Sequence, residues 1–245
     1  MTSLIKFIIG ILGALLMTSC SFDLSFGQIR GNGNVQTENF NISEEFDRVS
    51  AGNGWDVILE KGDSYSVVVE ADENILQAAD IYVKNGTLKV YCEDNIRSAS
   101  SKKVYVTYAD DLEGIGASSG AYITTKQVLE GEQLDLDVSS GGSIKTTAVV
   151  RNIDTDVSSG GSINIAGSTE SLDADVSSGG VIKAKELKAK FAEAEASSGG
   201  TIDLMVTDRL KARASSGGDI DYWGNPKQVD KPKKSMSGGS VDAKE

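Results

Sequence analysis

The chain has 245 residues and a formal net charge of −12, with 36 Asp and Glu against 24 Lys and Arg. A chain this acidic is poorly suited to bind nucleic acid or anionic lipid head groups. It contains no His and only two Cys, which excludes metal sites built on imidazole or on paired thiolates.

Residues 1–19 are predicted to be a lipoprotein signal peptide. Lys6 precedes an almost entirely apolar run from Phe7 to Met17, which is too short to span a bilayer as a mature helix, and Thr18-Ser19-Cys20 follows. This ending resembles a bacterial lipoprotein signal, although Met17 stands where Leu is usual, and a plain secretory signal cut nearby is the alternative. We expect a lipid on Cys20 to anchor the chain in the cell envelope, at the outer membrane, with residues 20–34 as a linker.

Residues 35–117 are predicted to form irregular first coils of a repetitive β-structure. Short alternating segments such as Val49 to Leu59 and Val104 to Tyr108 indicate strands, and Asn85-Gly86 indicates a hairpin or a corner. A stack of parallel strands needs an atypical terminal unit to cover its edge, which favours this interpretation. A separate N-terminal β domain is the alternative.

Residues 118–245 contain a regular repeat that determines the fold. Ser-Ser-Gly-Gly, followed one residue later by Ile, begins at Ser139, Ser158, Ser177, Ser197 and Ser215, and a variant begins at Ser118, so that the spacing is 18 to 21 residues. Self-similarity at this period is typical of solenoids, in which each unit buries its apolar face against its neighbours.

Within each repeat, residues alternate between apolar and charged, which is the pattern of a strand with one buried face. The Ile of each copy is predicted to lie in a buried aliphatic stack, formed by Ile144, Ile163, Ile182, Ile202 and Ile220. The two glycines are predicted to supply the positive φ of a corner between strands. We therefore predict an all-β chain folded as a parallel β-helix, because the patterns of leucine-rich, ankyrin and calcium-binding nonapeptide repeats are absent.

Four segments of the N-terminal half, together with the Gly-rich corners, carry a resemblance to a known family. They are Phe46-Asp47-Arg48-Val49, residues 55–62 (Trp-Asp-Val-Ile-Leu-Glu-Lys-Gly), residues 67–76 and Asn85-Gly86-Thr87-Leu88. With these motifs, residues 35–222 resemble the auto-transporter adhesin family with a head GIN domain. The resemblance implies a right-handed parallel β-helix, a place in the cell envelope and an adhesive role, and it implies no particular catalytic or binding residues.

An outward row of carboxylates is the candidate interaction surface. Its members occupy one position of successive repeats and are Asp137, Asp156, Asp175 and Glu195. Stacked coils place such side chains about 4.8 Å apart, where like charges repel. The row is interpreted either as a solvated face that resists sheet pairing or as a surface for weakly bound Ca²⁺ or a partner, and no other cofactor is expected.

The distribution of reactive groups argues against an enzyme. The repeated serines have no His and no evident Lys beside them, and the carboxylates are spread evenly rather than gathered as an acid and a base. We therefore expect a binding scaffold for a glycan or protein ligand of the cell envelope. A β-helix lyase or hydrolase acting on polysaccharides, and an envelope sensor domain, are the alternatives.

Overall fold

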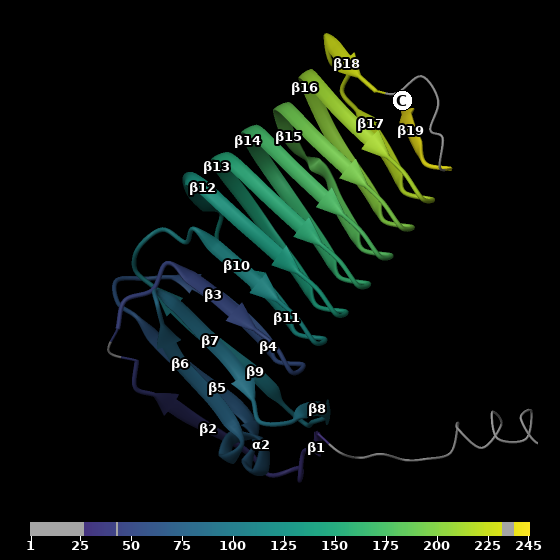
Figure 1. Cartoon of the computed structure of the whole chain (residues 1–245). Helices are drawn as coiled ribbons and strands as arrows, with labels where there is room; N and C mark the ends of the chain where they lie inside the picture. The colour runs from purple at the N-terminus through teal and green to yellow at the C-terminus, as the bar shows by residue number, and fades with distance from the viewer. Residues whose placement is uncertain (1–26, 43, 232–237) are drawn as a thin grey trace, which may run out of the picture.

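The computed structural model describes residues 27–42, 44–231 and 238–245, and Figure 1 shows that its coils stack along one long axis. Each coil contains an outgoing segment, a bend, a returning segment and a turn. The strands of the successive coils, in chain order, are β10 (Gly114–Ala117), β11 (Tyr122–Thr125), β12 (Leu129–Val138), β13 (Ser143–Val157), β14 (Ser162–Val176), β15 (Val181–Ala196), β16 (Thr201–Ala214), β17 (Asp219–Trp223), β18 (Gln228–Asp230) and β19 (Ser240–Ala243). Strands of successive coils pair in parallel, so the predicted parallel β-helix is confirmed.

The repeated isoleucines form the aliphatic stack that the sequence predicts. Ile163 pairs in register with Ile144 on one side and Ile182 on the other, and the stack continues to Ile202 and Ile220. All five side chains are fully buried. The stack therefore forms one continuous aliphatic core through these coils. Burial of each side chain of this size stabilises the fold by about 1.5–3 kcal/mol.

The corner between coils is a tight turn whose chemistry differs in one respect from the prediction. In Ser139-Ser140-Gly141-Gly142, the residues with positive φ are Ser140 (50°) and Gly141 (72°), and the Gly142 amide donates to the Ser139 carbonyl at 2.8 Å. Positive φ at both central residues is the type I′ turn, which suits the twist of paired strands. Only one of the two glycines therefore supplies positive φ.

The second glycine is required by the neighbouring coil. A Cβ on Gly142 would lie 2.5 Å from the carbonyl oxygen of Ala117, which belongs to the preceding coil. At the later corners a Cβ on the second glycine would likewise lie within 3.0 Å of an atom of the preceding coil, whereas the corner at Ser118 carries Ala121 at this position.

The first coil of the stack is built from β3 (Arg48–Ala51) and β4 (Asp56–Lys61). These strands pair in parallel with β10 and β11. Asn53 (φ 55°) and Gly54 (φ 87°) form its corner. On the other side of this coil, β7 (Thr87–Cys92) pairs with β3 and β9 (Lys102–Tyr108) pairs with β4, again in parallel.

Antiparallel strands cover the N-terminal end of the stack, a feature that the expectation of irregular coils did not contain. β5 (Ser66–Asp72) pairs antiparallel with β9 and with β2 (Val35–Phe40), and β6 (Ala79–Lys84) forms a hairpin with β7 through the positive-φ residues Asn85 and Gly86. The short helix α2 (Glu73–Gln77) and the pair β1 (Gln28–Arg30) and β8 (Asn95–Ser98) complete this end. Its buried side chains belong to the same apolar cluster as those of the coils.

The signal peptide and Cys20 lie outside the described residues, so their assignment stays a prediction. Within the part of the chain that the structure describes, no helix is long and apolar enough to cross a membrane.

Candidate binding surface

The register of the returning segments brings the predicted acidic row together. Asp137, Asp156, Asp175 and Glu195 are direct neighbours on β12, β13, β14 and β15. A second row lies beside it and consists of Asp135, Asp154, Asp173 and Glu193. Parallel strands are about 4.8 Å apart, so each row holds its carboxylates at that spacing. These two rows are called the acidic face below.

Cations close the acidic face at both ends. At the N-terminal end, Arg48 Nη1 donates to Asp135 Oδ2 at 2.9 Å. The guanidinium reaches across β10 because Gly114 has no side chain: a Cβ there would lie 2.4 Å from Arg48 Cζ. At the C-terminal end, Lys211 forms an ion pair with Glu193, and Arg213 lies 3.6 Å from Glu195. Among the described residues, no salt bridge reaches the middle of the face, at Asp154, Asp156, Asp173 and Asp175.

The pKa values of the acidic face reflect this arrangement. Burial and the neighbouring carboxylates, with Asp173 first among them, raise the pKa of Asp175 to about 6. Burial also raises the pKa values of Asp137, Asp154 and Asp173. For Asp135, hydrogen bonds from Gln133 and Arg48 outweigh burial and lower the pKa. The middle of the face therefore holds unfavourable negative charge at neutral pH.

We expect this charge to make the protein more stable below neutral pH. A carboxyl whose pKa is raised by folding binds more protons in the folded chain, so stability falls as pH rises from about 4, the unfolded value, through about 6, the folded value of Asp175. The substitution Asp175→Asn should raise the melting temperature at about pH 7 and change it little at about pH 3, because the carboxyl is then largely protonated in both the folded and the unfolded chain.

Asp135→Asn is the matched control for this experiment. It removes the acceptor of Arg48 from a carboxyl with a lowered pKa, so it should lower the melting temperature at about pH 7. Equal effects of the two substitutions at neutral pH would show that repulsion within the acidic face does not limit stability. Both melting curves can be followed by circular dichroism.

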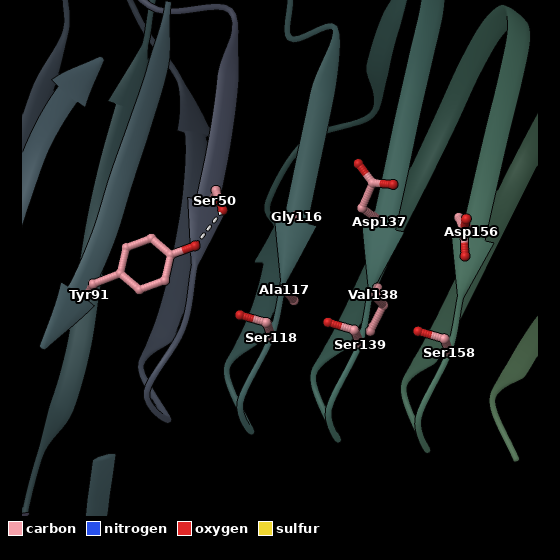
Figure 2. A pocket seen from close by; sticks show the side chains of 10 residues that line it. All are labelled: Ser50, Tyr91, Gly116, Ala117, Ser118, Asp137, Val138, Ser139, Asp156 and Ser158. Carbon is pink, nitrogen blue, oxygen red and sulfur yellow. Dashed lines mark hydrogen bonds between the residues drawn. The ribbon is translucent and has the colours of Figure 1, made fainter. Parts of the chain in front are cut away.

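A hollow of about 360 Å³ adjoins the N-terminal end of the acidic face (Figure 2). It forms because β10 carries Gly116 at the position that Asp137 occupies on β12. Its lining residues are Ser50, Tyr91, Gly116, Ala117, Ser118, Asp137, Val138, Ser139, Asp156 and Ser158. The hollow thus combines hydroxyl groups, two carboxylates and one aromatic residue.

The side of the hollow formed by Tyr91 is held firmly in place. Tyr91 Oη and Ser50 Oγ are hydrogen-bonded at 2.9 Å, and the indole of the buried Trp55 donates to the Tyr91 carbonyl at 2.9 Å. The ring passes over Gly52, where a Cβ would lie 2.6 Å from Tyr91 Cε1. Such support limits the conformational entropy that Tyr91 would lose on binding a ligand.

The first serine of each corner extends the hollow into a row. Figure 2 shows the hydroxyls of Ser118, Ser139 and Ser158 projecting to the same side of successive turns. Each is partly exposed, and Asp137 and Asp156 of the acidic face stand two residues before Ser139 and Ser158 in the chain. Hydroxyl and carboxylate oxygens at a constant spacing can accept and donate many equivalent hydrogen bonds, whereas catalysis needs an acid and a base that converge on one bond.

Sequence reasoning placed the acidic row but missed the hollow. Gly116 could have been found, because it stands two residues before Ser118, where the next four copies carry Asp or Glu. Tyr91 could not, because it reaches the site through the parallel pairing of β3 with β7, which no repeat in the sequence indicates.

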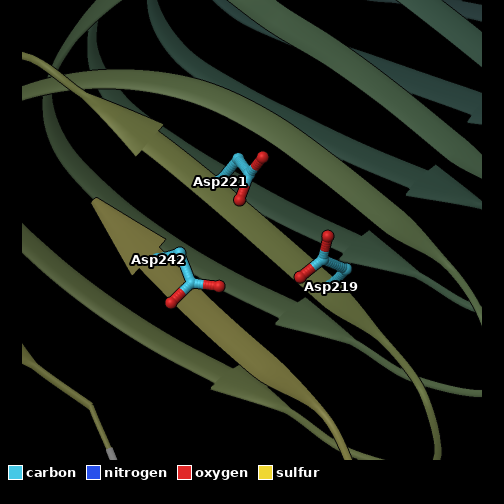
Figure 3. Close-up of side chains that lie close together, drawn as sticks. All are labelled: Asp219, Asp221 and Asp242. Atoms are coloured by element: carbon cyan, nitrogen blue, oxygen red, sulfur yellow. The ribbon is translucent and has the colours of Figure 1, made fainter. Parts of the chain in front are cut away.

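A second acidic cluster lies near the C-terminal end, on β17 and β19 (Figure 3). Oxygens of Asp219, Asp221 and Asp242 lie within 4.8 Å of one another. Lys244 Nζ lies 3.0 Å from Asp221, and Ser240 donates a hydrogen bond to Asp219. Neighbouring groups of the chain thus already contact two of the three carboxylates, and we assign no site to the cluster.

The stacked parallel coils define the chain as an all-β solenoid protein. It belongs to the family described as "Putative auto-transporter adhesin, head GIN domain", which matches residues 45–226. The family resemblance drawn from the sequence motifs is thereby confirmed. No curated protein matches the chain.

Three solved structures with the same fold come from Bacteroidetes. A putative adhesin from Bacteroides fragilis is 19% identical with a TM-score of 0.80, covering 88% of this chain and all of its own. A putative lipid binding protein from Parabacteroides distasonis is 22% identical with a TM-score of 0.68, and a putative adhesin from Parabacteroides merdae is 20% identical with a TM-score of 0.69; each covers 89% of this chain and all of its own. At these identities the likeness establishes the fold.

Proposed function

We propose that this chain is a non-catalytic adhesive protein of the bacterial cell envelope that binds a glycan along its acidic face. The observation that carries the proposal is the hollow at Tyr91, which opens onto a regular row of hydroxyls and carboxylates. A repetitive glycan could make many weak contacts with such a row, and their effects add through avidity. Membership of an adhesin family supports this role.

The chemistry of the hollow favours a sugar over a lipid or a reaction. Its apolar side chains are few, chiefly Ala117 and Val138, whereas a site for an acyl chain is lined predominantly by apolar groups. Its two carboxylates, Asp137 and Asp156, belong to the evenly spaced row rather than to a separate acid–base pair. A neutral sugar can donate its hydroxyls to them and accept from the serines.

Filling the hollow should abolish glycan binding. A Cβ on Gly116 would meet its nearest neighbour, Ser50 Oγ, at 3.5 Å, so Gly116→Leu can place its side chain in the hollow without a backbone clash. We expect at least about a tenfold loss of affinity for the best ligand on a neutral-glycan array, with stability changed by about 1 kcal/mol or less.

The control for Gly116→Leu is Asn164→Leu, which adds the same side chain to an exposed position of the outgoing segment of β14. Asn164→Leu should keep the affinity of the unmodified chain. Equal affinities of the two variants for the glycan would show that it binds outside the hollow. Cleavage of the bound polysaccharide by the chain would show that the protein is an enzyme.

The envelope location rests on Cys20, and we expect this residue to carry the lipid. Cells that produce the chain should incorporate a fatty-acid probe into it, and Cys20→Ser should eliminate the label, because no other residue of the predicted signal offers a thiol. Equal labelling of both chains would mean that the signal is of the plain secretory kind.

A further inference from the structure

One coil departs from the regular register and gathers basic residues on the side of the solenoid away from the corners. Between Ala184 and Lys188, β15 has residues without partners on β16, since Ala184 pairs with Leu204 and Lys188 with the next residue, Met205. The coil carries Lys183, Lys185, Lys188 and Lys190 on exposed positions. Bulges that re-aim side chains in this way are frequent beside functional sites.

A hollow of about 460 Å³ lies against this coil, at the bend that follows the outgoing segment. Its lining residues are Val149, Val150, Arg151, Ser168, Thr169, Glu170, Lys188 and Lys190. It exists because β14 carries the small Ser168 between Val149 of β13 and Lys188 of β15, which are its partners in the register. The buried Thr169 fixes the bend by donating to the Arg151 carbonyl at 2.9 Å.

The charge of this hollow is opposite to that of the molecule. Three cations line it against one carboxylate, Glu170, which lies 3.2 Å from Arg151. Lys188 and Lys190 form no salt bridge with any described residue. By contrast, the only charged groups that line the hollow at Tyr91 are carboxylates, and the hollow beside Tyr65 is lined by five carboxylates and no cation. The hollow beside Phe191 is lined by equal numbers of carboxylates and cations.

We propose that this basic hollow, formed by β13, β14 and β15, binds one acidic sugar unit of a polysaccharide through its carboxylate or sulfate group. Lys188 and Lys190 donate to the anion, since neither ammonium group forms a salt bridge with a described carboxylate, although the charge of Lys190 acts on Asp208. Val149, which is 50% exposed, offers an apolar contact to the sugar ring, and Ser168 offers a hydroxyl. The acidic face carries none of these residues, so this proposal does not rest on the function proposed for that face.

A polysaccharide fits this site better than an anionic membrane does. The hollow is a surface depression over three neighbouring strands, and Val149 is the only exposed large apolar side chain among the residues lining it. Peripheral binding to a bilayer requires a larger apolar area together with basic charge. The formal net charge of −12 also opposes approach to an extended anionic surface more than to a single charged unit.

The test measures binding of the purified chain to immobilised heparin and to polygalacturonate at low and moderate salt, with dextran as the uncharged polymer. The double substitution Lys188→Gln and Lys190→Gln should weaken binding to at least one acidic polymer by about five- to tenfold and reduce its salt dependence. The matched control, Lys145→Gln with Lys183→Gln, removes the same charge from exposed positions outside the hollow and should change affinity by about twofold or less.

Three outcomes would overturn the proposal: no binding to either acidic polymer at low salt, equal losses in both double variants, or Lys188-dependent binding to phosphatidylserine vesicles but to neither polymer. The variant Gly116→Leu separates this site from the acidic face, because it should keep its affinity for the acidic polymer whether or not the neutral-glycan site exists. A loss of acidic-polymer binding in Gly116→Leu would also contradict the assignment to the basic hollow.

Discussion

Replacing Ile163 by Asp is expected to unfold the stacked coils. The side chain of Ile163 is fully buried and lies in register between Ile144 and Ile182, so a carboxylate there would have neither solvent nor a cation beside it. An unpaired charge or an unsatisfied polar group in such a core costs more than about 4 kcal/mol, which is a large part of the stability of an ordinary domain. Loss of the β-sheet signal in circular dichroism would be the direct observation.

Two further substitutions show whether the effect comes from the aliphatic stack. Ile163→Val keeps the stack but removes one methylene, and should cost about 0.5–1.5 kcal/mol in urea unfolding. Asn164→Asp adds the same carboxylate one residue later on the exposed side of the strand, and should change stability by about 0.5 kcal/mol or less. A folded, monomeric Ile163→Asp chain would contradict the arrangement of the core.

The coils were predictable because every copy of the repeat carries the same pattern of apolar, charged and glycine residues. The alternation of apolar and charged residues around Val138 and Val157 indicates which face of each strand is buried, and the fixed place of Ile163 in its repeat indicates the register of the strands. Because paired strands must match the same residue of successive copies, the acidic row followed from the alignment alone. Repetition thus supplies information about which distant strands pair, which a single sequence normally lacks.

The N-terminal cover and the two hollows were not predictable in the same way. β5 and β6 join the sheet by antiparallel pairing, which their alternating residues allow but do not specify. Tyr91 comes from this irregular end, and the basic hollow lies on a coil whose register shifts between β14 and β15. In each case the site lies where the repeat is broken, so the rule that predicted the fold carried no information about it.

The corner glycines give the second large prediction, because adjacent residues of one turn should respond very differently to the same change. Gly141→Ala places a Cβ where nothing lies within 4 Å, and its cost of about 1–2 kcal/mol comes only from the positive φ of 72°. Gly142→Ala instead directs its Cβ at the Ala117 carbonyl, at 2.5 Å from the oxygen and 2.7 Å from the carbon.

The neighbouring coil cannot easily move away from a new methyl group at Gly142. The Ala117 carbonyl accepts a hydrogen bond from the Ser139 amide at 3.0 Å, and this bond holds the two coils at their spacing. Relief of the clash would therefore break or lengthen bonds between coils, so we expect Gly142→Ala to cost about 3 kcal/mol or more and to exceed Gly141→Ala by at least about 1.5 kcal/mol. Urea unfolding of the two variants beside the unmodified chain measures the difference. Because positive φ is confined to Ser140 and Gly141, a larger loss from Gly141→Ala would mean that strain in the turn, rather than contact between coils, explains the repeated glycine pair.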